Sequence, residues 1–250
     1  MPLEAWTYPI LLSSGLVAGL LNVVAGGGSF LTLPILIFMG LPPVTANGTN
    51  RVGILLQNIA AVWSFRRDKV IEPGWAAATA APSVLGAALG TLLAIWIDDQ
   101  TFRQVLSILM IVMSLWTLWD PIRPRRDSAG GPVKLGAATL AGFFLAGIYG
   151  GFVQAGVGFL LLVVTTLSGL DLVRGNSLKV LSLLISTPLS LAIFWWQGHV
   201  WWVPGLWLGA GTLMGGFLGA RLTVLKGHQW VRRVVTITVI AMALKLWLGR

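Results

Sequence analysis

The feature that most constrains this chain is the stretch from Ala5 to Asn50, which carries no charge and is nevertheless interrupted by helix breakers. It contains three consecutive glycines at 26–28, then Pro34 and the proline pair at 42–43. An uncharged stretch of this length belongs in a bilayer, where glycine and proline interrupt regular helix hydrogen bonding. Broken backbone at membrane depth is tolerated only where protein or a water-filled cavity surrounds it. The stretch therefore predicts a binding site of the kind that transporters build from discontinuous helices.

The composition indicates a membrane protein throughout. Of the 250 residues, 56% are hydrophobic and 10% are charged, whereas a soluble domain carries about 25% charge. Repeated apolar runs of 18 or more residues predict a polytopic α-helical membrane protein. The formal net charge of +9 is assigned to basic cytoplasmic loops rather than to nucleic-acid binding. Glu4 and the lack of a basic region before the first apolar run argue against a signal peptide, so we expect that run to be retained.

An all-α fold of eight to ten helical segments is expected, and ten candidate segments can be assigned. They are residues 8–24, a short 30–40, 48–65, 74–97 and 102–119, followed by 135–153, a short 158–169, 176–196, 202–225 and 231–248. Residues 120–134 hold three prolines, two glycines and three arginines, and they form the single hydrophilic connector. We therefore divide the chain into an N-terminal membrane repeat (1–119), a cytoplasmic linker (120–134) and a C-terminal membrane repeat (135–250).

The two halves match each other at an offset of 129 residues. Identical pairs include Gly27 and Gly156, Phe30 and Phe159, Leu31 and Leu160, Gly40 and Gly169, Asn47 and Asn176, Phe65 and Phe194, Gly86 and Gly215, Gly90 and Gly219, Gln100 and Gln229, and Arg103 and Arg232. Shared apolar residues mean little in so hydrophobic a chain, whereas matched glycine, amide and arginine residues mean more. The pattern predicts a duplicated unit of about five helical segments, as in many secondary transporters.

The distribution of Lys and Arg predicts the orientation of the two copies. Basic residues cluster at 66–69, 123–134, 174–179 and 226–233. Successive clusters are separated by apolar sequence that can cross twice, so all four can lie in the cytoplasm with both termini outside. The basic loop 66–69 corresponds to the uncharged residues 195–198. Corresponding loops thus face opposite sides, which makes the repeat inverted and requires an odd number of spans per half.

The lengths of the segments locate the candidate site. Residues 30–40 form only about 16 Å of helix, against a hydrocarbon core of about 30 Å. The run 52–65 is also too short to span, so its helix must begin nearer Asn47. This draws residues 47–51 toward membrane depth, and residues 158–169 and 176–179 mirror them in the second half.

Arg51 and Lys179 are the candidate charges for binding an anion. A charged side chain near the bilayer centre costs at least about 2.5 kcal/mol, so it should face a cavity or a partner. In the alternative interpretation, both residues cap helices at the interface and extend their charged ends toward water. The sequence leaves both interpretations open.

The glycine blocks supply further candidate groups. Free backbone N–H groups at a helix start suit an oxyanion, and Ser29 and Gln154 add side-chain donors. The alternative is close packing of helices through small residues, which we expect for Gly86, Gly90, Gly215 and Gly219. The predicted substrate-binding residues are Gly26, Gly27, Gly28, Ser29, Asn47, Gly48, Thr49, Asn50, Arg51, Gln154, Gly156, Gly158, Asn176 and Lys179.

The chain offers little for catalysis. It has no cysteine and two histidines, His199 and His228, and no carboxylate falls inside a confident span. It shows no Ser–His–Asp grouping, no metal-ligand spacing and no nucleotide-binding loop in a suitable context. We therefore expect a protein that is not an enzyme and needs no cofactor or metal.

Residues 18–36 (AGLLNVVAGGGSFLTLPIL), residues 46–50 (ANGTN), and the related residues 142–159 with Asn176 resemble the sulfite exporter TauE/SafE family. The resemblance covers essentially the whole chain. It implies an inner-membrane protein that moves small sulfur-containing anions, such as sulfite or organosulfonates, usually outward. It carries over to Gly26, Gly27, Gly28, Pro34, Ala46, Gly48 and Thr49. The second half departs from the pattern with Gln154-Ala155-Gly156-Val157-Gly158, and with Val163 where the first half has Pro34.

The combined expectation is a secondary transporter that exports sulfite or an organosulfonate across the inner membrane. Its partners would be the small anion, the lipid bilayer and a coupling proton or ion, with no nucleic acid. A passive anion channel and a non-transporting scaffold or sensor subunit remain alternatives. The sequence does not fix the oligomeric state.

Overall fold

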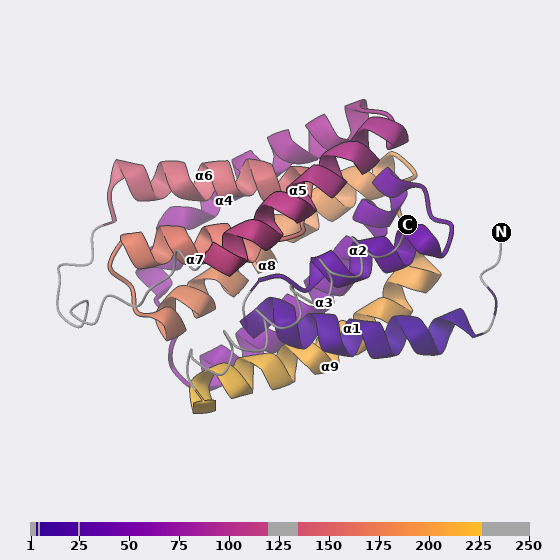
Figure 1. The fold of residues 1–250 in the computed structure, drawn as a ribbon. Helices are drawn as coiled ribbons and strands as arrows, with labels where there is room; N and C mark the ends of the chain where they lie inside the picture. Colours follow the sequence, from indigo (N-terminus) through magenta and orange to yellow (C-terminus); the bar gives the residue numbers. More distant parts are fainter. Residues whose placement is uncertain (1–3, 5, 25, 120–134, 227–250) are drawn as a thin grey trace.

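The computed structural model describes residues 4, 6–24, 26–119 and 135–226, which form nine helices and no strand (Figure 1). The helices are α1 (Thr7–Val24), α2 (Ser29–Phe38), α3 (Pro43–Arg67), α4 (Pro73–Trp96), α5 (Asp99–Trp119), α6 (Ala137–Phe152), α7 (Val157–Leu167), α8 (Leu172–Trp196) and α9 (Trp202–Lys226). The expected all-α architecture of eight to ten segments is confirmed. The linker and the predicted segment 231–248 lie outside the described residues.

Two long helices begin earlier than the apolar pattern indicates, because their starts are set by local chemistry. α3 begins at Pro43, five residues before the predicted start, since proline suits the first position of a helix. α8 begins at Leu172, where the Asp171 carboxylate accepts bonds from the N–H groups of Val173 and Arg174. Both helices have 25 residues, about 37 Å of helix, and can cross the bilayer.

Asp98 organises the start of α5. Its carboxylate accepts bonds from the hydroxyl and the N–H of Thr101, which hold the pKa of that carboxyl below its usual range. The neighbouring Asp99 Oδ1 accepts a bond of 2.9 Å from the N–H of Val44. The start of α5 is therefore tied to the start of α3, at one end of the molecule.

The duplication is visible in the backbone where helices end. Gly40 after α2 and Gly169 after α7 have φ of 93° and 94°, and the following residues, Leu41 and Leu170, each bond to the carbonyl five residues back. Lys69 after α3 and Gly198 after α8 match in the same way, with φ of 56° and 76°. This is the left-handed helix end that glycine favours. Each pair is separated by 129 residues, the offset found in the sequence.

The long helices form two groups of three that share a direction. α1 and α9 run parallel: the Cα of Gly211 lies against Leu12 and that of Gly215 against Leu16. α4 and α6 run parallel, since Gly86 lies against Phe144 and Gly90 against Ile148. Residue numbers also rise together in the contacts of α3 with α9 and in the hydrogen bonds of α4 with α8, so these two pairs of helices are parallel as well. The packing role expected for Gly86, Gly90, Gly215 and Gly219 is confirmed, because a Cβ there would overlap the facing backbone.

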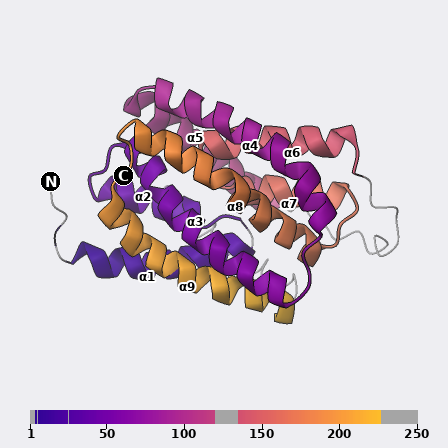
Figure 2. The same cartoon turned by 180° about the vertical axis from the view of Figure 1, so that it is seen from behind.

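The two groups run in opposite directions and meet where α3 packs against α8 (Figure 2). At one end, Thr45 Oγ1 lies 3.1 Å from Nδ1 of His199, which follows α8. At the other end, Ser177 Oγ donates a bond of 2.9 Å to the carbonyl of Val70, which follows α3. Corresponding helices of the two halves are therefore antiparallel, as an inverted repeat requires.

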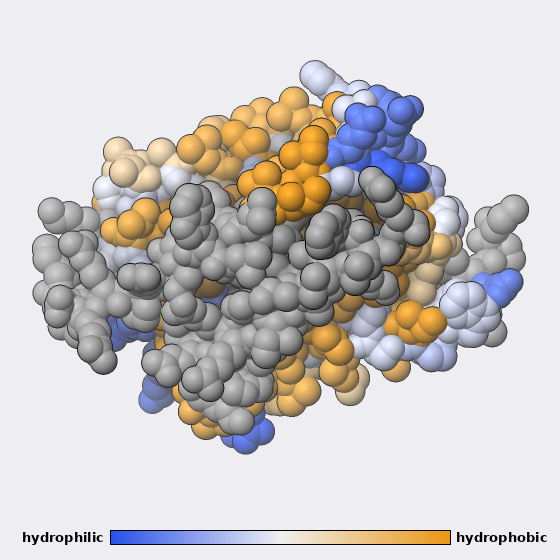
Figure 3. Space-filling model, in the orientation of Figure 1, coloured by the Kyte–Doolittle hydropathy of each residue, from blue (hydrophilic) through white to orange (hydrophobic). Residues whose placement is uncertain are grey.

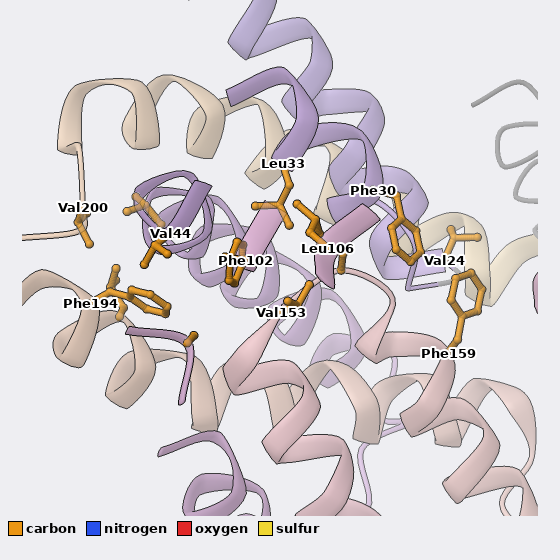
Figure 4. Close-up of a cluster of buried hydrophobic side chains, with 14 residues drawn as sticks. Val24, Phe30, Leu33, Val44, Phe102, Leu106, Val153, Phe159, Phe194 and Val200 are labelled. Atoms are coloured by element: carbon orange, nitrogen blue, oxygen red, sulfur yellow. The ribbon is translucent and has the colours of Figure 1, made fainter. Parts of the chain in front are cut away.

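Both predicted helix breaks are present. Residues 26–28 between α1 and α2, and residues 153–156 between α6 and α7, are not helical. α2 and α7 have 10 and 11 residues, about 15–17 Å, and neither can cross the bilayer as a helix. The breaks touch: a Cβ on Gly158 would overlap Gly26. In Figure 4, Phe30 and Phe159 lie close to each other beside Val24, at the start of the two short helices.

The surface suits a bilayer. Among the described helices, α1, α4, α8 and α9 are long and apolar enough to cross a membrane by themselves. Large hydrophobic side chains are exposed along α4, α5 and α9. In Figure 3, hydrophobic residues cover much of the coloured surface, and hydrophilic residues gather toward its ends. The polar side chains of α3 from Thr45 to Ser64, by contrast, are buried, and the exposed Arg66 and Arg67 lie at its end.

Candidate functional site

Each half contributes one buried cation, and each cation binds the end of the first helix of the other half. Arg51 on α3 and Lys179 on α8 are 1% and 0% exposed. Arg51 donates to the carbonyls of Gly150 and Gly151 at the end of α6. Lys179 Nζ donates to the carbonyls of Asn22 and Val23 at the end of α1, over 3.2 and 2.8 Å. These terminal carbonyls lack a helical donor, and a cation there also suits the helix dipole.

The capping predicted in the alternative interpretation is therefore observed, but the extension of the charges toward water is not. Neither cation has a carboxylate partner among the described residues, where both ion pairs belong to the exposed Arg174. α1, α2, α4, α6 and α7 carry no charged residue at all. The described part of the interior thus holds two basic side chains without an acidic partner, an arrangement that favours an anion.

Arg51 retains donor capacity beyond its capping role. Its Nη1 donates to Gln154 Oε1 over 2.8 Å, and its guanidinium carbon lies 4.8 Å from the centre of the Phe194 ring. Its Nε is buried and has no hydrogen-bond partner. A buried unpaired donor is costly, by about 1–3 kcal/mol for an ordinary group and more for a charged one. Arg51 therefore has a free N–H for an additional acceptor.

A cavity adjoins Arg51 among α4, α6, α7 and α8. It is lined by Arg51, Ser83, Ala87, Phe143, Ala146, Gly147, Gly150, Gln154, Val157, Leu161, Ser182, Leu183, Ser186 and Ser190. Ser83 and Ser182 share a hydrogen bond of 2.7 Å across α4 and α8. The cavity has room for about one water molecule, so it is too small in this conformation to hold an oxyanion. One end presents the guanidinium, an amide and hydroxyls, which are the donors that an oxyanion needs.

The serines of this cavity were not among the predicted site residues. Ser182, Ser186 and Ser190 recur at every fourth position of α8 and therefore share one face of that helix. Hydroxyls repeating at this spacing on a membrane span were a signal that could have found them. Ser83 lies on α4 and has no such signal, because only tertiary packing brings it to Ser182.

The corresponding region of the N-terminal half is filled by side-chain hydrogen bonds. Thr32 donates to Asn50 Oδ1 over 2.6 Å, and Asn50 Nδ2 donates to Ser29 Oγ. Asn22 Nδ2 donates to Gln57 Oε1 over 3.2 Å. The predicted residues Ser29 and Asn50 are therefore together, but here they bind each other. The two halves therefore share a fold but differ in the empty space beside the helix break, which is a cavity in one half and is filled by side chains in the other.

The remaining predicted residues serve the packing of the breaks and of helix ends. Gly26 and Gly156 have φ of 97° and 81°, which glycine adopts readily. Gly27, Gly28 and Gly158 lie against Phe159, Ala18 and Gly26, respectively. Gly48 and Thr49 contact the turn between α8 and α9, where Thr49 Oγ1 accepts from the N–H of Trp201. Asn47 donates to the carbonyl of Phe152, and Asn176 donates to Thr223. Binding of substrate by any of these residues stays a prediction.

Many secondary transporters are built from an inverted repeat with discontinuous helices at the centre. The chain matches the family model described as sulfite exporter TauE/SafE over residues 11–246. It therefore belongs to the sulfite exporter TauE/SafE family and is a multi-pass membrane transporter.

Curated relatives agree with this assignment. The chain is 31% identical to a probable membrane transporter protein of Haemophilus influenzae, over 95% of this chain and 93% of the relative. It is 30% identical to the probable membrane transporter protein YfcA of Escherichia coli K12, over 95% and 88%. It is 28% identical to the probable membrane transporter protein ORF9 of a Sinorhizobium species, over 94% and 90%. No solved structure matches the chain significantly.

Proposed function

We propose that this transporter carries a small sulfur-containing oxyanion, sulfite or an organosulfonate, outward across the inner membrane, coupled to a proton or another ion. Arg51 is the cation that holds the anion. The family description supports the sulfur oxyanion as cargo. In this proposal the basic ends of α3 and α8 lie in the cytoplasm and both termini lie outside, as the distribution of Lys and Arg predicts.

The observation that carries this proposal is the environment of Arg51. Its guanidinium is buried, has no carboxylate partner among the described residues, keeps Nε unpaired and lines a cavity rich in hydroxyls. Without a bound anion, this charge is compensated only by carbonyl, amide and aromatic groups. An oxyanion at Nε would supply the missing acceptor without displacing the capping bonds to α6.

The small size of the cavity favours a carrier over a passive channel. A channel needs a continuous aqueous path, whereas this cavity has room for about one water molecule. A carrier instead passes through occluded conformations and exchanges anions across the membrane. Counterflow of labelled anion, which requires a carrier, therefore separates the two mechanisms.

The test is counterflow of labelled sulfite and labelled ethanesulfonate in proteoliposomes that contain Arg51→Gln, Arg51→Lys or unchanged protein. We expect Arg51→Gln to lower counterflow by about 100-fold or more, because a charge-assisted bond in a dry site is lost. Arg51→Lys should lose about 10-fold, since an ammonium lacks the forked geometry of the guanidinium.

Arg221→Gln, which removes an exposed arginine of α9, is the matched control and should leave counterflow unchanged. A thermal shift with sulfite provides a second readout: the anion should stabilise the unchanged protein and not Arg51→Gln. Full counterflow by folded Arg51→Gln would remove Arg51 from the site. Failure of the unchanged protein to move either anion would reject this class of cargo.

A further inference from the structure

The contact between α3 and α8 contains a symmetric stripe of residues. Arg51, Asn58 and Phe65 recur at every seventh position of α3 and share one face of that helix. The residues 129 positions later are Val180, Thr187 and Phe194 on α8. All six side chains are buried. The stripe is therefore repeated on two antiparallel helices.

The register between the two stripes is set by contacts at both ends. Arg51 lies against the Phe194 ring, with 4.8 Å between the guanidinium carbon and the ring centre. Phe65 and Val180 belong to one buried hydrophobic cluster. Because the helices are antiparallel, the middle members, Asn58 and Thr187, stand opposite each other. They are symmetry mates, so their position is the pseudo-two-fold axis of the molecule.

Both middle residues have an unsatisfied polar atom. Asn58 is 0% exposed and Thr187 is 1% exposed. Asn58 Oδ1 accepts from Gln57, but its Nδ2 has no partner, and Thr187 Oγ1 has none either. In the described part of the chain, the buried side-chain atoms without partners are Asn47 Oδ1, Arg51 Nε, Asn58 Nδ2, Asn176 Oδ1 and Thr187 Oγ1. Unpaired buried groups are rare in folded proteins, so two of them at the same level of the contact between α3 and α8 require an explanation.

The backbone beside Thr187 is incomplete as well. Pro188 lies inside α8 and has no N–H, so the carbonyl of Leu184 cannot receive its usual helical bond. Freed backbone groups at membrane depth are tolerated where they face protein or a polar cavity. The middle of the contact between α3 and α8 therefore contains two unpaired side-chain groups and a backbone carbonyl without its usual helical donor.

We propose that Asn58 and Thr187 form a central anion station through which the transported oxyanion passes between the Arg51 and Lys179 ends of the carrier. The proposal rests on the proposed function, an anion carrier with Arg51 at its site. Asn58 is seven residues from Arg51, and Thr187 is eight residues from Lys179. These separations correspond to about 10 and 12 Å along the helix axes. The amide N–H of Asn58 and the hydroxyl of Thr187 would bind the anion between two cations without trapping it.

An anion suits this position better than a cation does. The flanking charges, Arg51 and Lys179, are both positive, and no described helix carries a carboxylate at membrane depth. The unpaired amide atom is a donor, and the hydroxyl can donate. Neutral donors bind an anion more weakly than a charged group does. The anion can therefore leave as well as bind, which a station along a transport path requires.

The chain contains no cysteine, so single cysteines at this position report accessibility directly. Thr187→Cys and Asn58→Cys should react with the anionic reagent 2-sulfonatoethyl methanethiosulfonate in proteoliposomes, and ethanesulfonate, which does not react with this reagent, should slow that reaction. The cationic trimethylammonioethyl analogue should react at least about 10-fold more slowly, because Arg51 and Lys179 repel it. The matched control is Thr165→Cys, since Thr165 is equally buried and its hydroxyl bonds within its own helix. We expect that control to stay unlabelled.

Transport provides the second arm. Thr187→Val removes an unpaired hydroxyl with little change of shape, so it should leave thermal stability unchanged or raised. We expect sulfite counterflow in this variant to fall by about 10-fold, the effect of one hydrogen bond of ordinary strength. Asn58→Asp, which puts a carboxylate on the path, should lower counterflow by about 100-fold or more, and Asn58→Leu should lower it less. Thr165→Val should transport normally.

The outcomes separate the two proposals. Absence of labelling at both cysteines in protein that transports sulfite would overturn the central station, as would equal transport by Asn58→Asp and Asn58→Leu. Anion-selective labelling in protein that moves neither sulfite nor ethanesulfonate would support the station and reject the proposed cargo.

Discussion

Arg51 and Lys179 show how one residue can serve the fold and the site together. The carbonyls that Lys179 binds, Asn22 and Val23, correspond to positions 151 and 152 at the repeat offset. Arg51 binds the carbonyls of 150 and 151, and the two cations are themselves one position out of register. Long flexible side chains tolerate such a slip, whereas the helix ends that they cap must be present in both halves.

Gly158 is a residue at which a single methyl group should disrupt the centre of the molecule. A Cβ at this position would overlap the backbone of Gly26, which has a positive φ and cannot shift cheaply. We expect Gly158→Ala to lower the free energy of unfolding by about 1–3 kcal/mol or more, as overpacking does. Thermal unfolding of the detergent-solubilised protein is the measurement.

Gly74→Ala is the control for that substitution. Gly74 lies in the first turn of α4, and a Cβ there would meet nothing within 4 Å. The stability of this variant should be unchanged or raised by up to about 1 kcal/mol, the difference in helix propensity. Equal stability of Gly158→Ala and the unchanged protein would show that the breaks do not depend on this contact.

At the scale of elements, the two copies end their helices in the same way with different residues. The left-handed residue that follows the helix is Gly40 after α2 and Gly169 after α7, whereas it is Lys69 after α3 and Gly198 after α8. A left-handed conformation costs a residue other than glycine about 1 kcal/mol. Lys69 is the only described residue other than glycine with a positive φ. The first copy therefore retains some strain that the second copy lacks.

Lys69→Gly and Gly198→Ala should move the backbone strain from the first copy to the second. Lys69→Gly is expected to raise the free energy of unfolding by up to about 1 kcal/mol, and Gly198→Ala to lower it by a similar amount. Both residues are exposed, and a Cβ at Gly198 meets nothing within 4 Å, so the effect comes from backbone conformation alone. Paired thermal or chemical unfolding curves measure it. A fall in stability of Lys69→Gly would mean that the lysine side chain contributes more than its strain costs.

For the whole molecule, the inverted repeat puts the turn after α3 and the turn after α8 on opposite faces. Gln197→Cys and Lys69→Cys place single exposed thiols at these turns in a protein without cysteine. With both termini outside, an impermeant maleimide should label Gln197→Cys in intact spheroplasts and should label Lys69→Cys only after lysis. Labelling of Lys69→Cys alone would reverse the orientation, and labelling of both would contradict the inverted arrangement.

Much of the fold could be predicted because its signals are short in range or repeated. The uncharged glycine and proline block located the first break, and the matched residues Gly27 and Gly156 located the second. Helix starts were predicted less well. Pro43 and Asp171 add one turn to α3 and α8, where local capping matters more than hydropathy.

The sequence by itself determined the membrane class, the duplication, the inversion and the two helix breaks, because these follow from hydropathy, charge and residue spacing, which depend only on the order of residues. It also singled out Arg51, Gln154 and Lys179, since charges and amides are conspicuous in apolar runs. Only the tertiary structure decided that Lys179 caps α1, that Ser83 meets Ser182 and that Asn58 stands opposite Thr187. Those relations join helices about a hundred or more residues apart, and their register follows from how glycine and aromatic surfaces pack in three dimensions.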